Sequence, residues 1–221
     1  MMTGIKDNGD SLDKGSLSAS NNEYFDVQFE RLQLSGESFN KICFDRCQFT
    51  QCDFSQCQFS SCQFVDCEFF KCNLSSVELN SSGFSDTVFE ESKVIGVNWT
   101  RVHWPQVKLT SPIAFYRCNI SYSTFMGLSL NEIVMEGCKA ESVDFRESNL
   151  SHANLAYTHF SGSQFVHTNL TKADFTEAMD YQINPNENEI TQAIFSFPEV
   201  VSLLNFFDIT INGITEPDSE G

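Results

Sequence analysis

Residues 47–76 read CQFTQ CDFSQ CQFSS CQFVD CEFFK CNLSS, six pentapeptides with Phe or Leu in the third place and Cys in the first. The apolar residue therefore returns every five positions. That spacing matches neither the 3.6-residue period of an α-helix nor the two-residue period of a strand. A chain with this period turns a corner once per pentapeptide, and it winds into a solenoid.

The same period extends from this stretch in both directions. From Tyr24 to Phe175 there are 31 successive uncharged centres, and 16 of them are Phe. The only irregular step follows Leu109, where six residues separate two centres instead of five. We interpret this as a one-residue bulge that relieves crowding by Trp99 and Trp104, in preference to a binding feature. The bulge comprises Thr110, Ser111, Pro112, Ile113 and Ala114.

The position two residues before each centre is compact, and it holds eight of the nine cysteines. A bulky centre and a compact partner predict two inward side chains per pentapeptide, with polar residues facing water. Successive cysteines would lie on different walls, whereas a zinc site needs ligands that converge on one point. The pattern therefore predicts buried, reduced thiols without metal or cofactor, and a cytoplasmic protein. Only Cys43 falls outside the inward position.

Pentapeptides such as CDFSQ at 52–56 and ADFTE at 173–177 resemble those of the pentapeptide-repeat family. The resemblance implies an all-β fold, a right-handed quadrilateral β-helix with four pentapeptides per coil. On this basis residues 23–180 form nearly eight coils, which make a rod about 37 Å long at about 4.8 Å per coil.

The two ends of the chain differ from the repeats. Residues 1–22 are polar and predict a disordered leader, and 214–221 predict a disordered acidic tail. Residues 181–213 predict a segment that caps the open coil with a short α-helix beginning near Pro198. One helical stripe cannot bury all of the apolar residues there, so we expect the segment to form a homodimer contact as well. The cap and dimer residues are Phe195, Phe197, Val200, Val201, Leu203, Leu204, Phe206 and Phe207.

The composition excludes several classes of function. Thirty acidic residues against 13 basic ones give a formal charge of −17, which argues against direct nucleic-acid binding. The charge favours a cationic partner surface, or it serves solubility alone. No apolar run is long enough to span a membrane. The four histidines have no neighbours at catalytic or metal-binding spacing, and we therefore predict that the protein is not an enzyme.

Sorting the charges by wall, on the assumption that the bulge leaves the wall order unchanged, predicts one acidic face for partner binding. Its inward centres would be Tyr24, Phe44, Phe64, Phe84, Trp104, Phe125, Phe145 and Phe165. Its acidic residues would be Glu23, Asp26, Asp45, Asp66, Asp86, Asp144 and Glu147, opposed only by Arg46 and Arg146.

An acidic rod with a C-terminal helical cap resembles the Qnr, MfpA, McbG and AlbG group of topoisomerase-protecting proteins. The resemblance implies a homodimer that mimics DNA, binds DNA gyrase and topoisomerase IV, and modulates their response to quinolone antibiotics. Several Qnr proteins need two longer loops for protection, and a single bulge is more similar to the loopless members, which inhibit the enzyme. The alternative is a generic acidic interaction scaffold with another partner.

Overall fold

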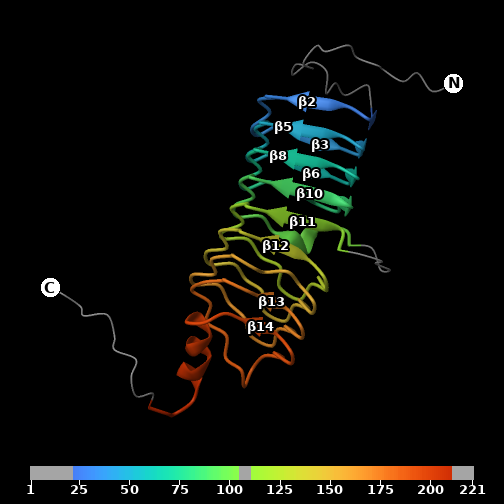
Figure 1. The fold of residues 1–221 in the computed structure, drawn as a ribbon. Helices are drawn as coiled ribbons and strands as arrows, with labels where there is room; N and C mark the ends of the chain where they lie inside the picture. The colour runs from blue at the N-terminus through green and yellow to red at the C-terminus, as the bar shows by residue number, and fades with distance from the viewer. Residues whose placement is uncertain (1–21, 105–110, 211–221) are drawn as a thin grey trace.

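The chain winds into a rod of stacked coils, as the computed structural model of residues 22–104 and 111–210 shows (Figure 1). Successive coils pair in parallel at intervals of 20 residues, with Phe44 opposite Phe64 and Phe49 opposite Phe69. One column of centres runs from Phe29 to Phe195 through nine rungs, which makes eight full turns. At about 4.8 Å per turn the rod is about 38 Å long.

Short strands occupy the flat sides of the coils, and all of their pairings are parallel. The largest ladder has the order β12-β11-β10-β8-β5-β2, the next has the order β1-β4-β7-β9, and two further pairs are β3-β6 and β13-β14. The strands are β1 Glu23–Phe25, β2 Gln28–Glu30, β3 Ser38–Asn40, β4 Cys43–Asp45, β5 Gln48–Thr50, β6 Gln58–Ser60, β7 Gln63–Val65, β8 Glu68–Phe70, β9 Gly83–Ser85, β10 Thr87–Glu90, β11 Ile113–Tyr116, β12 Val134–Glu136, β13 Asp174–Phe175 and β14 Ile194–Phe195. The described residues also form two 3-10 helices, η1 Trp99–Arg101 and η2 Glu199–Phe206.

Four columns of inward centres define four faces. Face 1 has centres Tyr24, Phe44, Phe64, Phe84, Trp104, Leu130, Leu150, Leu170 and Ile190. Face 2 has centres Phe29, Phe49, Phe69, Phe89, Phe115, Met135, Leu155, Phe175 and Phe195. Face 3 has centres Leu34, Phe54, Leu74, Val94, Ile120, Ala140 and Phe160. Face 4 has centres Phe39, Phe59, Leu79, Trp99, Phe125, Phe145, Phe165 and Ile183.

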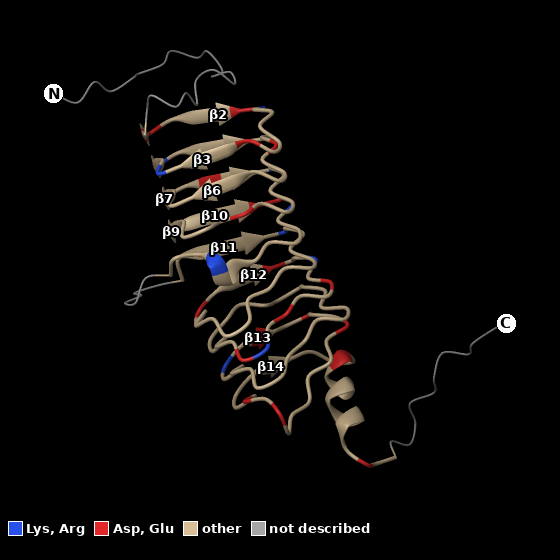
Figure 2. Ribbon diagram, turned by 180° about the vertical axis from the view of Figure 1, so that it is seen from behind, with Lys and Arg blue, Asp and Glu red and all other residues tan. Residues whose placement is uncertain are grey.

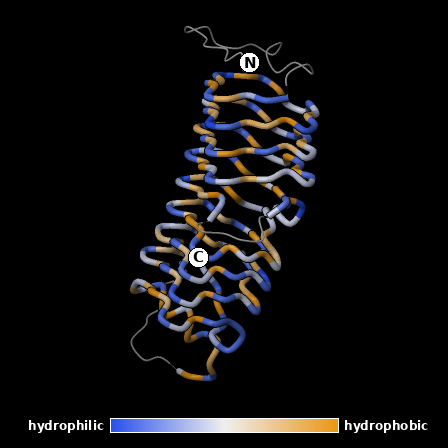
Figure 3. The backbone as a smooth tube through the Cα atoms, turned by 90° about the vertical axis from the view of Figure 1, so that its right-hand side faces the viewer, coloured by the Kyte–Doolittle hydropathy of each residue, from blue (hydrophilic) through white to orange (hydrophobic). Residues whose placement is uncertain are grey.

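The core is the stack of these centres, as the period of five predicts. Twenty-nine of the 31 predicted centres are buried; Trp104 is partly buried, and Leu109 lies outside the described residues. Hydrophobic and hydrophilic residues alternate along the coils (Figure 3). Rings stack within a column, with the centroids of Phe49 and Phe69 4.6 Å apart, and meet edge to face between columns. Such ring pairs contribute about 0.5–1.5 kcal/mol each beyond the burial of area.

The compact inward residue does more than fill space, because its polar atom donates to a carbonyl of the preceding coil. The thiol of Cys57 donates to Leu34 O at 2.8 Å, and the hydroxyl of Ser82 donates to Phe59 O at 3.0 Å. The predicted burial of the thiols is confirmed, since eight of the nine are buried and Cys43 is partly exposed. Burial raises the pKa of Cys57 to about 11, so its thiol stays protonated at neutral pH.

Most corners depend on a left-handed backbone at the last residue of the pentapeptide. Thirty described residues have positive φ, between 48° and 76°, and 25 of them are not glycine. An L-residue there costs about 1–2 kcal/mol. The corner N–H recovers part of that cost by donating to the next coil, as Asp66 N does to Ser85 O at 2.8 Å.

The one-residue bulge predicted at Thr110 to Ala114 is wrong. Phe89 lies opposite Phe115, a separation of 26 residues where the other coils have 20, so this coil contains six extra residues. Residues 105–110 lie outside the described residues, whereas Ile113 and Ala114 belong to β11. A period of five cannot distinguish one extra residue from six, because both shift the register of the centres by the same amount.

The insertion also rotates the order of the faces. The ring of Phe125 stacks on Trp99 at 5.7 Å and 10°, not on Trp104 as the one-residue bulge predicts. Every centre after the insertion therefore lies one face away from its predicted column. The predicted column from Tyr24 to Phe165 is thus two half-columns, face 1 before the insertion and face 4 after it.

The C-terminal boundary of the solenoid is also corrected, because coiling continues past residue 180. Ile183 lies opposite Phe165, two residues short of the usual separation, and Phe195 regains the 20-residue separation from Phe175. Phe195 is thus an inward centre instead of a cap residue, and its ring stacks on Phe175 at 5.1 Å. The fold class is confirmed, a quadrilateral β-helix with a short C-terminal helix, although that helix is 3-10 and not α.

Candidate protein-binding surfaces

The acidic side chains gather around the edge that faces 1 and 2 share, which we call the acidic edge. Face 1 and its corner residues carry seven acidic against two basic residues, and face 2 carries seven against three. The acidic corner residues between the two faces are Asp26, Asp66, Asp86 and Glu132. Figure 2 shows acidic segments from the first coil to the last.

The diagonally opposite edge, between faces 3 and 4, is the reverse case. Its described corner residues with positive φ are Gly36, Gln56, Ser76, Gly96, Tyr122, Ser142, Gly162 and Asp180, and only Asp180, in the last coil, is charged. Because a quadrilateral coil keeps these two edges apart along the whole rod, the charge of the described residues is polarised across the rod. The sequence already contained this signal, but only the true register of the coils reveals it.

The structure places the first half of the predicted acidic residues together and places the second half elsewhere. Glu23, Asp26, Asp45, Asp66 and Asp86 lie on face 1 or its corner with face 2. Asp144 lies on face 4, and Glu147 lies at the corner between faces 4 and 1, because the six-residue insertion rotates everything after it. The acidic residues that the sequence analysis missed are those on face 2, together with Glu132 and Glu189 of face 1.

Ion pairs neutralise part of the charge locally. Arg46 Nε lies 2.7 Å from Asp26 Oδ1, and its guanidinium carbon stands 3.9 Å above the ring centroid of Phe25. On face 2, Arg117 pairs with Glu90. On face 4, Arg146 binds Asp144 through two nitrogens at 2.9 and 2.8 Å and lowers the pKa of that carboxyl. The exposed pairs contribute about 0–1 kcal/mol each, so their main effect is on the surface potential.

The C-terminal end carries a second candidate surface. Leu203 of η2 is buried and Val200 is partly buried against the core, which makes this side of the helix a cap. Leu204 and Phe206 of the same helix are exposed, and 81% of Phe197, just before the helix, is accessible. We call this set the end patch: Ile194, Phe197, Leu204, Phe206, Phe207 and Ile209.

The described residues offer little for catalysis. No group of three His, Cys, Asp or Glu side chains in residues 22–104 and 111–210 could hold a metal ion. The same residues contain no helix long and apolar enough to cross a bilayer. His152, His159 and His167 fall within one 20-residue turn but at different faces or corners of it, His103 lies on an earlier coil, and His159 approaches Asp180 at 3.6 Å. The geometry therefore offers surfaces for binding and no assembled reaction centre among these residues.

Comparison with known proteins identifies the family. The model of the pentapeptide repeat region matches residues 23–99 and 97–175. The chain belongs to the pentapeptide-repeat family. No curated protein matches the sequence.

The fold is similar to that of solved structures of QnrB1. A trypsin-treated variant of QnrB1, described as a plasmid-mediated fluoroquinolone resistance protein, aligns with a TM-score of 0.62 at 16% identity, over 86% of this chain and 98% of its own. A second trypsin-treated QnrB1 variant gives 0.58 at 16% identity over the same shares. HetL, a pentapeptide-repeat protein involved in heterocyst differentiation regulation in the cyanobacterium Nostoc sp. strain PCC 7120, gives 0.34 at 11% identity over 80% of this chain and 88% of its own.

Proposed function

We propose that this protein is a DNA mimic that binds DNA gyrase and topoisomerase IV in a reducing cytoplasm and modulates their response to quinolone-type poisons. The observation that carries the proposal is the acidic edge of a rigid rod. The fold shared with QnrB1 supports the shape, and the charge pattern supports the class of partner.

The charge density of the rod approaches that of duplex DNA. The described residues include 24 acidic and ten basic side chains, a net charge of −14 over about 38 Å. B-DNA carries one charge per about 1.7 Å of axis, about 22 charges over the same length. The rod therefore carries about three fifths of the DNA charge, enough to steer it onto a surface built to hold DNA.

The end patch extends the likeness by pairing two rods. An exposed apolar surface at the end of a soluble solenoid is typical of a protein–protein contact, and a symmetric contact would join two copies end to end. The dimer would be about 75 Å long, near the length of 22 base pairs at about 3.4 Å each. We infer a homodimer through η2 and the residues around it.

The register bears on the choice between protection and inhibition. With six extra residues between Trp104 and β11, the chain carries one insertion at a corner of the acidic edge, where the sequence analysis expected a one-residue bulge. The proposal therefore covers modulation in either direction.

A gyrase supercoiling assay with ciprofloxacin tests the proposal. Titration with this protein should either restore supercoiling in the presence of the drug or inhibit it without the drug. Asp66→Lys with Asp86→Lys should remove most of the effect, whereas Glu78→Lys with Glu141→Lys, near the opposite edge, should leave most of it. Both double variants change the net charge by the same amount. If wild type has no effect and binds neither enzyme at low salt, the proposal is wrong and the scaffold alternative is favoured.

A further inference from the structure

Face 2 breaks the rule that outward positions are polar. The residue before the inward centre is Val88 in β10, Ala114 in β11 and Val134 in β12, and these three lie opposite one another in the ladder. All three are partly exposed. On faces 1, 3 and 4, no two successive described coils have an aliphatic residue at the equivalent position. The apolar row is thus a local feature of face 2 and not a property of the repeat.

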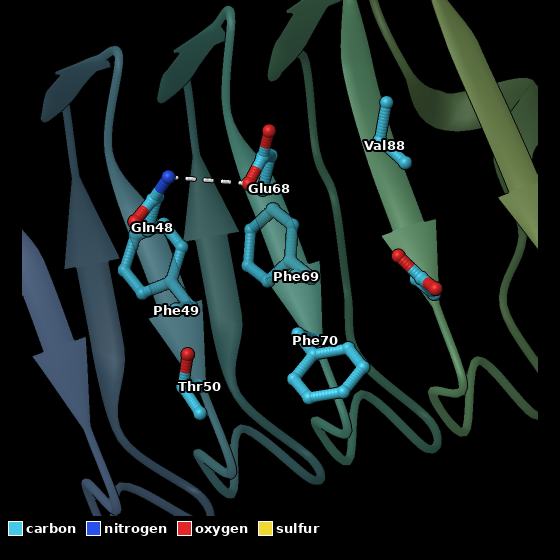
Figure 4. A pocket seen from close by; sticks show the side chains of 8 residues that line it. Gln48, Phe49, Thr50, Glu68, Phe69, Phe70 and Val88 are labelled. Atoms are coloured by element: carbon cyan, nitrogen blue, oxygen red, sulfur yellow. Dashed lines mark hydrogen bonds between the residues drawn. The ribbon is translucent and has the colours of Figure 1, made fainter.

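A second row of outward side chains, at the position after each inward centre, turns this side of face 2 into a groove. Gln48, Glu68 and Val88 form one ridge, and Thr50 and Phe70 form the other together with Glu90 (Figure 4). They enclose a shallow hollow of about 260 Å³ above the buried rings of Phe49 and Phe69. In the next two coils Ala114 and Val134 lie in line with the first ridge, and Tyr116 lies in line with the second.

The groove is about 6.6 Å wide, since its ridges are two residues apart along each strand. It runs parallel to the rod axis with a row every 4.8 Å or so.

Acidic residues flank this apolar strip on both sides. Asp66 and Asp86 occupy the corner on one side, and Glu90 and Glu136 stand in the second ridge. Two of the three bases on this face are engaged with neighbouring acids, Lys71 with Glu91 at 3.4 Å and Arg117 with Glu90, and the third, Arg31 in the first coil, donates to Gln51 Oε1 at 3.1 Å. A second copy of the chain, or an anionic membrane, would bring like charges together here, and that repulsion is unfavourable. The chemistry favours a partner that is apolar in the middle and cationic at its flanks.

The spacing favours a helical partner over an extended one. A helix along the groove presents one side-chain row per 5.4 Å turn, which departs from the coil spacing by about 0.6 Å per row. An extended chain presents a side chain on one face every 6.6 Å or so, and it loses register within two coils. We propose that the groove on face 2 binds an amphipathic helix with an apolar stripe between Lys or Arg flanks. This site does not depend on topoisomerase binding.

The probe for the test is a synthetic 18-residue peptide with Leu at helical spacing and Lys on both flanks. Its control has the same composition with Leu distributed around the helix. Fluorescence anisotropy would give the affinity of the full-length protein for each peptide. Val88→Thr with Val134→Thr keeps the β-branched shape and removes two methyl groups from the strip. Ile95→Thr with Val166→Thr is the matched control, because these two outward aliphatic residues are partly exposed on faces 3 and 4.

Wild type should bind the amphipathic peptide at least about tenfold more tightly than its control, and the Val88/Val134 variant should lose about tenfold. The matched control should bind like wild type, and equal melting temperatures would show that all variants fold. Equal affinity for both peptides would mean charge attraction alone and would overturn the proposal. Unchanged affinity in the Val88/Val134 variant would also overturn it. So would a loss of self-association in that variant by light scattering, because a second copy would then cover the groove.

Discussion

Replacing Phe145 by Ala should lower the free energy of unfolding by about 3–5 kcal/mol, the usual cost of removing a buried aromatic ring. Phe145 is fully buried on face 4, and its ring stacks between Phe125 at 5.5 Å and Phe165 at 5.1 Å. Phe160 meets its edge at 6.1 Å. Neighbouring coils are fixed by backbone hydrogen bonds, so they cannot close the cavity, and the cost should lie in the upper half of that range.

Urea unfolding followed by far-UV circular dichroism measures this loss. Val166→Ala is the control, since Val166 is partly exposed on the same face, and it should cost less than about 0.5 kcal/mol. Each coil of a solenoid contacts only its neighbours, so the coils on the two sides of the cavity should no longer unfold together. The free energy of unfolding should then fall less steeply with urea concentration than it does for wild type. A loss below about 1 kcal/mol with an unchanged slope would refute the reasoning from stacked rings.

Three further outcomes are expected. In native protein an alkylating reagent should modify Cys43 first, because the other eight thiols are buried. This should hold even though partial burial and Asp45 raise the pKa of Cys43. Labelling of Cys57 at a similar rate, measured by mass spectrometry, would contradict the prediction. Burial raises the pKa of Tyr181 to about 12, so the folded state holds the phenol proton more tightly than the unfolded state. The free energy of unfolding should therefore fall by about 2–3 kcal/mol between pH 10 and 12. Tyr181→Phe should lack this fall, and identical curves of stability against pH for the two proteins would contradict the prediction. Light scattering should show a dimer for wild type, and Leu204→Asp with Phe207→Asp should give monomer or aggregate; a monomeric wild type would exclude the end-patch dimer.

The period of five was sufficient to predict the core, but not the order of the faces. Phe49, Phe69 and their equivalents are bulky, regular and uncharged, so burial follows from the pattern alone. The six-residue insertion was hidden because Leu109 falls in phase with the repeat, and the phase is all that a periodic pattern reports. The position of Asp144 depends on that insertion, whereas Asp66 and Asp86 precede it, and for this reason the structure keeps only the first half of the predicted acidic residues together.

The C-terminal coil shows a different limit of the same pattern. Between Phe175 and Phe195 the chain omits two residues before Ile183 and restores two after it, so the coil closes at its usual length while the pentapeptide phase is broken in between. Asp180 sits where the next centre is expected, and the sequence analysis therefore ended the solenoid there. The type of η2 was not predictable either, because an apolar stripe at spacings of three and four fits an α-helix and a 3-10 helix over only eight residues.

The excess of acidic residues at the acidic edge over the edge between faces 3 and 4, where Asp180 is the one charged corner residue described, gives the rod a transverse electric dipole. In the field of a cationic cleft such a dipole feels a torque about the long axis, so the rod would turn its acidic edge inward before any atoms touch. Orientation is usually what reduces protein association rates from the diffusion limit to about 10⁵–10⁷ M⁻¹s⁻¹. This torque acts over a Debye length of about 8 Å at physiological salt. Within that distance the rod would be oriented by the field instead of by random rotation, which would raise the rate of association.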